Sequence, residues 1–177
     1  MDKIEFMCNW LKPDEIWNFA ENVRMQYCHA GELPVDVEHI VEFDLRLDIE
    51  PMHNLLRETD MDAYLRSDLT GIIVDYDRYM EARFANRMRF SFAHELGHLY
   101  LHKNLYASIS FHSAEEWLEI LQSLPESEYK NFEYQANEFA GRLLVPRNEL
   151  FSELEISLEI IKQNHKLLVS FKRWGKK

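Results

Sequence analysis

The stretch of sequence that decides the fold is Arg89-Phe-Ser-Phe-Ala-His-Glu-Leu-Gly-His-Leu-Tyr-Leu-His102, an apolar segment of helical length that contains the pattern His-Glu-x-x-His. Residues four apart lie on one face of a helix, so His94 and His98 can point a ring nitrogen at the same metal ion. Glu95 lies about 100° further round the helix, where it can touch a water molecule at the metal without ligating the ion. The pattern predicts a zinc hydrolase in which Glu95 is the general base.

The same five-residue pattern also occurs on helices that bind nothing, so its flanks matter. Here apolar residues surround the whole helix and predict that it is buried; they are Phe90, Phe92, Ala93, Leu96, Leu99, Tyr100 and Leu101. Two histidines and a glutamate in a buried helix need partners, because burying an unpaired polar group is costly. A metal ion supplies a partner for both histidines.

The composition predicts a globular, cytoplasmic chain of one domain. The 177 residues are 46% apolar and include only 5 Gly and 5 Pro, which leaves no room for long low-complexity linkers. No apolar run approaches the ~18 residues of a membrane span, and the first residues lack the features of a signal peptide. Cys8 and Cys28 fit neither a disulfide framework nor a Cys-x-x-Cys zinc site, so we expect reduced thiols.

Charge disfavours direct binding to nucleic acid, because the net charge is −11. After Glu159 the chain has no acid, but it has six bases: Lys162, Lys166, Lys172, Arg173, Lys176 and Lys177. This basic cluster has two interpretations that the sequence leaves open. It can complement the dipole of a C-terminal helix and continue as a solvated tail, or it can form a docking patch for an acidic partner.

Periodicity predicts an α+β fold in which a small mixed or antiparallel sheet of about three strands packs on a mainly helical core. The expected strands are Leu47–Met52, Asp62–Ser67 and Gly71–Asp75, the last two joined as a hairpin and followed by a polar turn at 75–77. The expected helices run from Pro13 to a stop near Gly31, from Asp36 to Arg46, from Asn86 to His102, from Ala114 to Leu124, from Glu126 to Leu144, and from Pro146 with a break to Trp174. Residues 103–113 are expected to be irregular.

A catalytic zinc site needs a third protein ligand. His102 shares a face with His98, but it lies ~12 Å along the axis from His94, too far for one ion on a straight helix. Glu133 is better placed, since it falls in the core-facing stripe of its helix with Ala136 and Ala140. Those small residues, opposite Gly97, would let the two helices cross closely with zinc between them. The alternative is that Glu133 pairs with an arginine such as Arg87 or Arg89.

Other polar residues are candidates for supporting roles. Asn137, one turn after Glu133, can accept a hydrogen bond from a ligating histidine or can simply be a polar residue at the surface edge. His102 can support the site from behind or from the substrate side. The donor that stabilises an oxyanion cannot be chosen from the sequence among four candidates: Tyr129, Tyr134, His102 and His112. The strand Gly71–Val74 is a candidate exposed edge for pairing with an extended substrate.

The chain resembles the ImmA/IrrE family of metallopeptidases over roughly residues 10–150. The segment 89–102 is followed by Glu133-Tyr-Gln-Ala-Asn-Glu-Phe-Ala140 and by Leu143-Leu-Val-Pro146, in which Val145 replaces a commoner methionine. The resemblance implies a thermolysin-like core, zinc ligands His94, His98 and Glu133, and a catalytic Glu95. It also implies that a helix-turn-helix repressor is the substrate. Residues 151–177 match nothing in this pattern, so we expect a metallopeptidase domain at 1–150 and a C-terminal helical extension with a basic end.

Two functions fit this sequence. The first is a zinc peptidase that cleaves a DNA-binding repressor or similar regulator at a specific site. The second is a zinc-binding regulatory or toxin–antitoxin-type module that binds a repressor or antitoxin without cleaving it. A purely structural zinc site is disfavoured because Glu95 is intact and only three ligands are evident. Neither function requires a membrane or direct contact with nucleic acid.

Overall fold

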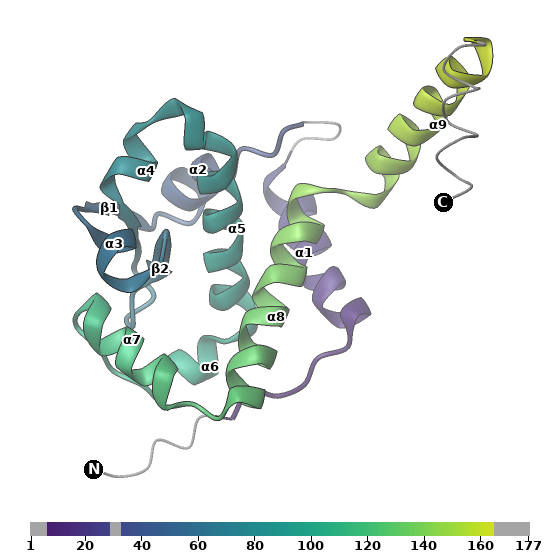
Figure 1. Cartoon of the computed structure of the whole chain (residues 1–177). Coiled ribbons are helices and arrows are strands. Elements are labelled where there is room, and N and C mark those ends of the chain that lie inside the picture. Colours follow the sequence, from purple (N-terminus) through teal and green to yellow (C-terminus); the bar gives the residue numbers. More distant parts are fainter. Residues whose placement is uncertain (1–6, 29–32, 165–177) are drawn as a thin grey trace. The chain divides into compact units, whose positions relative to one another are not determined.

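The computed structural model describes residues 7–28 and 33–164 and consists of two units, residues 1–144 and 145–177 (Figure 1). The first unit contains a three-stranded sheet and most of the helices. In the second, the described structure is α9 (Arg147–Gln163), which follows Pro146. The predicted continuation to Trp174 lies outside the described residues, as do all members of the basic cluster except Lys162.

The sheet has the order β1-β3-β2, in which β1 is Asp48–Met52, β2 is Ala63–Leu65 and β3 is Gly71–Asp75. β1 runs parallel to β3, with Ile49 opposite Ile72, and β2 runs antiparallel to it, with Tyr64 opposite Ile73. Together with the helices, this mixed sheet confirms the predicted α+β class and the hairpin between the second and third strands.

The expectation that Gly71–Val74 forms an exposed edge is wrong. β3 is the central strand of the sheet and is buried along its whole length. Its continuous run of isoleucine and valine is typical of a strand covered on both faces. The strand at the edge is β2, which also packs against α5 (Ala85–Leu101).

Helices α5 and α8 (Glu126–Leu144) lie side by side in the first unit, and α1 (Pro13–Tyr27) packs on the far side of α8 (Figure 1). The contact between α5 and α8 is close at Gly97. A Cβ atom at this position would lie 2.9 Å from the Cα of Ala136 and 3.0 Å from its carbonyl oxygen. The predicted close crossing at Gly97 and Ala136 is therefore confirmed.

The remaining elements are short, and several begin at side-chain caps. They are α2 (Val37–His39), the π-helix η1 (Ile40–Asp44), α3 (Leu55–Thr59), α4 (Tyr76–Met80), the 3-10 helix η2 (Ala82–Phe84), α6 (Lys103–Tyr106) and α7 (Ala114–Ser123). The Ser113 hydroxyl accepts a hydrogen bond from the Glu116 N–H and starts α7. At α1 the Glu15 carboxylate accepts one from the Lys12 N–H, and Pro13 occupies the first turn.

Four local predictions differ from the structure. The polar turn expected at 75–77 is the start of α4, because the Asp75 carboxylate accepts hydrogen bonds from the N–H groups of both Arg78 and Leu56 and so caps two helices. The single α-helix expected from Asp36 to Arg46 is instead two elements: α2 is α-helical for three residues, and the chain then continues as the π-helix η1. The irregular stretch at 103–113 begins with α6. The first helix ends at Tyr27, and Gly31 lies outside the described residues.

The hydrophobic core of the first unit is formed by the sheet together with α1, α5 and α8, and it contains the fully buried side chains of Ile16, Ile72, Phe92, Leu96 and Phe139. This core holds α5 in place between β2 and α8. Within the described ranges, none of the helices has the length and apolar content that crossing a membrane would require.

Candidate functional site

Three side chains from α5 and α8 converge on one point. The Nε2 atoms of His94 and His98 are 2.9 Å apart, and the Glu133 carboxylate lies 3.3 Å from the first and 3.8 Å from the second. The separation of the two histidines by one helical turn, and the close crossing at Gly97, produce this convergence. All three distances are below ~4.2 Å, twice the zinc–ligand distance, so one ion can contact all three residues.

The other ring nitrogen of each histidine is held from behind. The Nδ1 atom of His94 lies 3.1 Å from the Asn137 Oδ1, and that of His98 lies 2.9 Å from the Nδ1 of His102. Asn137 therefore contacts His94, a predicted ligand. This agrees with the interpretation that it supports a ligating histidine. His102 lies at the end of a helix that stays regular to Leu101, and it supports His98 from the side opposite the convergence point.

This arrangement fits a metal cation. When the Nδ1 of His94 donates its hydrogen to Asn137, its Nε2 carries a lone pair that faces another ring nitrogen and a carboxylate. Such a set of donors, half-buried and turned toward one another, is unfavourable without a positive charge at its centre. His94, His98 and Glu133 form a group of metal-binding type whose ligand atoms lie within 4.8 Å of one another.

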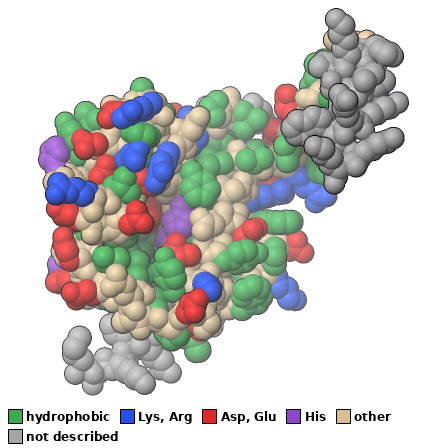
Figure 2. Space-filling model, viewed as in Figure 1, with side chains coloured by type: hydrophobic (Ala, Val, Ile, Leu, Met, Phe, Trp, Pro, Cys, Tyr) green, Lys and Arg blue, Asp and Glu red, His purple; other side chains and the backbone are tan. Residues whose placement is uncertain are grey.

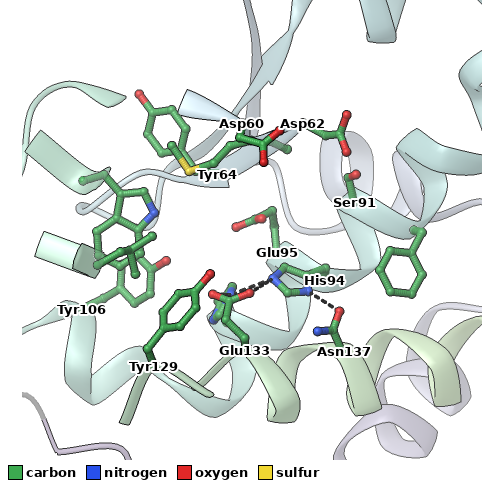
Figure 3. A pocket seen from close by; sticks show the side chains of 16 residues that line it. Asp60, Asp62, Tyr64, Ser91, His94, Glu95, Tyr106, Tyr129, Glu133 and Asn137 are labelled. Carbon is green, nitrogen blue, oxygen red and sulfur yellow. Dashed lines mark hydrogen bonds and ion pairs between the residues drawn. The ribbon is translucent and has the colours of Figure 1, made fainter. Parts of the chain in front are cut away.

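Glu95 is turned to the other side of the cleft from the three converging side chains (Figure 3). Its side chain is 5% exposed, and its Oε2 accepts a hydrogen bond of 2.7 Å from the backbone N–H of Leu65 in β2. Burial raises the pKa of this carboxyl to about 7 and the charge of Glu133 adds to the increase, whereas His94 and the Leu65 N–H oppose it. A carboxylate with a pKa near neutrality is suited to accepting and returning a proton.

The three histidines differ in their ionisation. Burial alone would lower the pKa of His94, but its hydrogen bond with Glu133 and the charges of Glu95 and Glu133 raise it overall. Burial lowers the pKa of His98 well below its usual value, and the neighbouring rings add to this effect. Burial also lowers the pKa of His102 to about 4, although its hydrogen bond to Gln135 acts in the opposite direction. His98 and His102 are therefore neutral at pH 7.

The convergence point opens into a cleft of about 270 Å³ between β2, α5, α7 and α8. In Figure 2 a histidine side chain is visible in a hollow flanked by acidic and apolar side chains. Figure 3 shows the hydroxyl groups of Tyr106 and Tyr129 turned toward the cleft, on the same side as Glu133. Apart from the site residues themselves, the cleft is lined by Asp60, Met61, Asp62, Ala63, Tyr64, Phe90, Ser91, Trp117 and Leu121.

Two further expectations, an arginine partner for Glu133 and burial of α5 on every side, do not agree with the structure. In the described structure Arg87 pairs with Asp62 and Arg89 with Asn86, so the alternative that either one pairs with Glu133 is wrong. Phe90 is 41% exposed at the cleft, so α5 is not buried on every side.

Only one of the four oxyanion candidates, Tyr129, lines the cleft. The ring of Tyr134 stacks on Trp10 instead, and His112 lines a separate cavity beside Phe111.

Three features of the site were missed by sequence reasoning. The first is Tyr106, which is 1% exposed and whose hydroxyl has no hydrogen-bond partner among the described residues. The second is the N–H of Leu65, which no sequence motif indicates because it belongs to the backbone. The third is Gln135, fully buried beside His102. Only Gln135 had a sequence signal, since it is a polar residue two positions from Glu133 in a strongly periodic helix.

Comparison with known proteins gives a family but no individual relative. A family model described as the IrrE N-terminal-like domain, Peptidase M78, matches residues 81–172. No curated protein and no solved structure matched the chain. The matched region includes α5 and α8 with all three converging side chains and Glu95, and it covers just over half of the 177 residues. The chain therefore belongs to the Peptidase M78 (ImmA/IrrE) family, which indicates a metallopeptidase-type domain and a bound metal.

Proposed function

We propose that this protein is a zinc-dependent peptidase that cleaves a DNA-binding regulator at one or a few sites. The observation that carries the proposal is the convergence of His94, His98 and Glu133 in a cleft that also contains the buried carboxylate of Glu95. Membership of the family supports the peptidase class, and a thermolysin-like arrangement of the core is part of the same proposal.

Zinc suits the donor set. Two imidazoles and one carboxylate are a known ligand set of catalytic zinc, which keeps a further position open for the reaction. When bound, zinc would act as a Lewis acid that polarises the scissile carbonyl and lowers the pKa of water. In this chain Asn137 and His102 orient the two rings so that both Nε2 atoms face the same point.

Glu95 accepts the proton of the attacking water and returns it to the leaving nitrogen. The Leu65 N–H holds one carboxylate oxygen, Oε2, and fixes the side chain at the side of the cleft. The second oxygen then remains for proton transfer.

Tyr106 and Tyr129 supply hydrogen-bond donors for the oxyanion that forms at the scissile carbonyl. Burial raises the pKa of Tyr106 well above its usual value, and the charges of Glu95 and Glu133 add to this, so its hydroxyl keeps its hydrogen.

The edge of β2 provides a surface for an extended peptide. The carbonyl of Asp62 and the N–H of Arg66 bond to β3, so the backbone groups of the residues between them alternate. Those of Ala63 and Leu65 therefore face away from β3, toward the side on which the Leu65 N–H meets Glu95. A substrate strand beside Ala63 would add to the sheet and place its backbone next to the converging side chains.

The proposed substrate class is supported by the family resemblance and by the charge of the chain. The net charge of −11 favours association with a basic protein, and DNA-binding regulators are basic on the face that contacts phosphates. We therefore propose a helix-turn-helix repressor in the cytoplasm as the substrate.

The test is incubation of zinc-loaded protein with the helix-turn-helix repressor encoded beside its gene, followed by mass spectrometry of the products and by measurement of repressor release from DNA. Wild type should give one or a few fragments, and Glu95→Gln should keep its zinc but give none, because only the proton acceptor is lost. If folded, zinc-loaded Glu95→Gln releases the repressor as well as wild type does, catalysis is dispensable. The protein would then be a binding module.

A further inference from the structure

A buried series of hydrogen bonds leads from the site to the N-terminal segment of the chain. The Nδ1 atoms of His98 and His102 are 2.9 Å apart, and the Nε2 of His102 lies 3.2 Å from the Oε1 of Gln135. The Nε2 of Gln135 then donates to the carbonyl oxygen of Asn9 at 2.8 Å. His98, His102 and Gln135 are each 3% exposed or less.

The direction of every hydrogen in this series is determined by its far end. The carbonyl of Asn9 can only accept, so the amide of Gln135 must present its NH₂ group to Asn9 and its oxygen to His102. The Nε2 of His102 therefore carries a hydrogen. A neutral imidazole has one N–H, so the Nδ1 of this ring presents a lone pair to the Nδ1 of His98, 2.9 Å away. The Nδ1 of His98 must donate to that lone pair. The Nε2 of His98 is thereby left with a lone pair facing His94 and Glu133.

The segment that determines this order is docked on one face of α8. Glu128, Asn131 and Gln135 are three and four residues apart, so they lie on one face of the helix. The N–H of Cys8 donates to the Glu128 carboxylate at 2.8 Å, and the side-chain amide of Asn131 donates to the carbonyl of Cys8 at 2.9 Å. Gln135 also donates to the Oδ1 of Asn131, which links the two amides. Two residues of the N-terminal segment and three of α8 thus form one hydrogen-bonded network.

We infer that Gln135 and His102 are positioning residues which hold His98 in the tautomer that can bind a metal, and that docking of Cys8 and Asn9 on α8 is coupled to metal affinity. The inference rests on the metal-binding part of the proposed function. Coupling of this kind is reciprocal: if docking strengthens metal binding, bound metal must strengthen docking by the same factor.

The first test compares two variants of α8. Gln135→Met keeps the size of the side chain but removes its hydrogen bonds to His102, Asn9 and Asn131. Phe139→Leu is a core substitution on the same helix outside the network. Zinc affinity is measured by competition with a chromophoric chelator. Gln135→Met should bind zinc about 10- to 100-fold more weakly than wild type, because loss of a residue that supports a metal ligand has effects of that size. Phe139→Leu leaves the network intact and should bind zinc as wild type does. In the metal-free proteins, ¹⁵N NMR of the ring of His98 should show the Nδ1–H tautomer in wild type and a mixture of the Nδ1–H and Nε2–H tautomers in Gln135→Met.

The second test uses Cys8, which is 5% exposed, as a reporter of docking. Saturating zinc should slow alkylation of Cys8 in wild type about tenfold, as mapped by mass spectrometry, and by less than about twofold in Gln135→Met. Equal protection in the two proteins would mean that zinc acts through global stability, and it would overturn the inference. Equal zinc affinities would overturn it as well while leaving the proposed function intact. If wild type itself binds no zinc, both this inference and the proposed function fail.

Discussion

Replacement of Gly97 by alanine tests whether the close crossing of α5 and α8 builds the site. The added Cβ would lie 2.9 Å from the Cα of Ala136, 3.0 Å from its carbonyl oxygen and 3.3 Å from its Cβ. Two of these three atoms belong to the backbone of α8, which cannot rotate away as a side chain can. To reach an ordinary separation of ~3.5 Å, the helices must move apart by about 0.5 Å.

Gly141→Ala is the matched control. It lies in α8, and a Cβ there would meet nothing within 4 Å. Both substitutions gain helix propensity of up to ~1 kcal/mol, so this contribution roughly cancels between them. The difference that remains is the cost of overpacking, about 1–3 kcal/mol. We therefore expect the metal-free Gly97→Ala protein to be less stable than Gly141→Ala by that amount in urea unfolding.

The same shift should weaken metal binding. Glu133 is one helical turn from Ala136, so a movement of α8 by about 0.5 Å carries its carboxylate away from His94 and His98 by more than the ~0.2 Å that zinc geometry tolerates. Zinc affinity should fall at least about tenfold in Gly97→Ala and remain unchanged in Gly141→Ala. If the two variants have the same unfolding free energy and the same zinc affinity, the crossing at Gly97 does not position the ligands, and the reasoning is refuted.

Two further substitutions test separate parts of the site. Glu133→Ala removes a ligand, so the zinc content measured by elemental analysis should fall from about one ion per chain to less than half, whereas Glu95→Gln should retain the metal; equal loss from both would show that their roles are assigned wrongly. Ala63→Pro removes an N–H that faces away from β3, and an edge strand tolerates proline there. It should therefore lower kcat/KM for the repressor about tenfold or more with zinc content unchanged, and an unaltered kcat/KM would exclude β2 as the substrate strand.

The features that could be predicted from the sequence depend on helical periodicity. The boundaries expected for the helix around His94 were Asn86 and His102, and the observed ones are Ala85 and Leu101. The sequence points to Glu133 because the angular positions of residues on a regular helix are fixed by its 3.6-residue period. The same calculation paired Gly97 with small residues on the second helix. A long helix with strong periodicity thus specifies both its own length and the face on which its functional residues lie.

Features that depend on distant pairing could not be predicted in this way. An apolar strand such as β3 has the same appearance in sequence at the centre of a sheet and at a buried edge, since the choice depends on where β1 and β2 dock. The two caps made by Asp75 require α3, which lies some twenty residues earlier in the chain, to be folded against it. The hydrogen bonds of Gln135 depend on Asn9, 126 residues away. In each case the missing information is a long-range contact that leaves no local pattern.

The elements of the site fall into two groups with different support. The three converging side chains and Glu95 lie on α5 and α8, within the residues 81–172 that match the family. The Leu65 N–H that holds Glu95, and the outward-facing edge at Ala63, lie on β2, before that match begins. The proposed metal site is thus built from the part of the chain that matches the family, and the surface proposed to hold the substrate is built from a part that the match does not include. Since the carboxylate of Glu95, the proposed base, bonds directly to β2, a substrate strand added at this edge would contact the same backbone segment that orients it. Binding of the peptide and positioning of the base are therefore physically linked through three residues of one short strand.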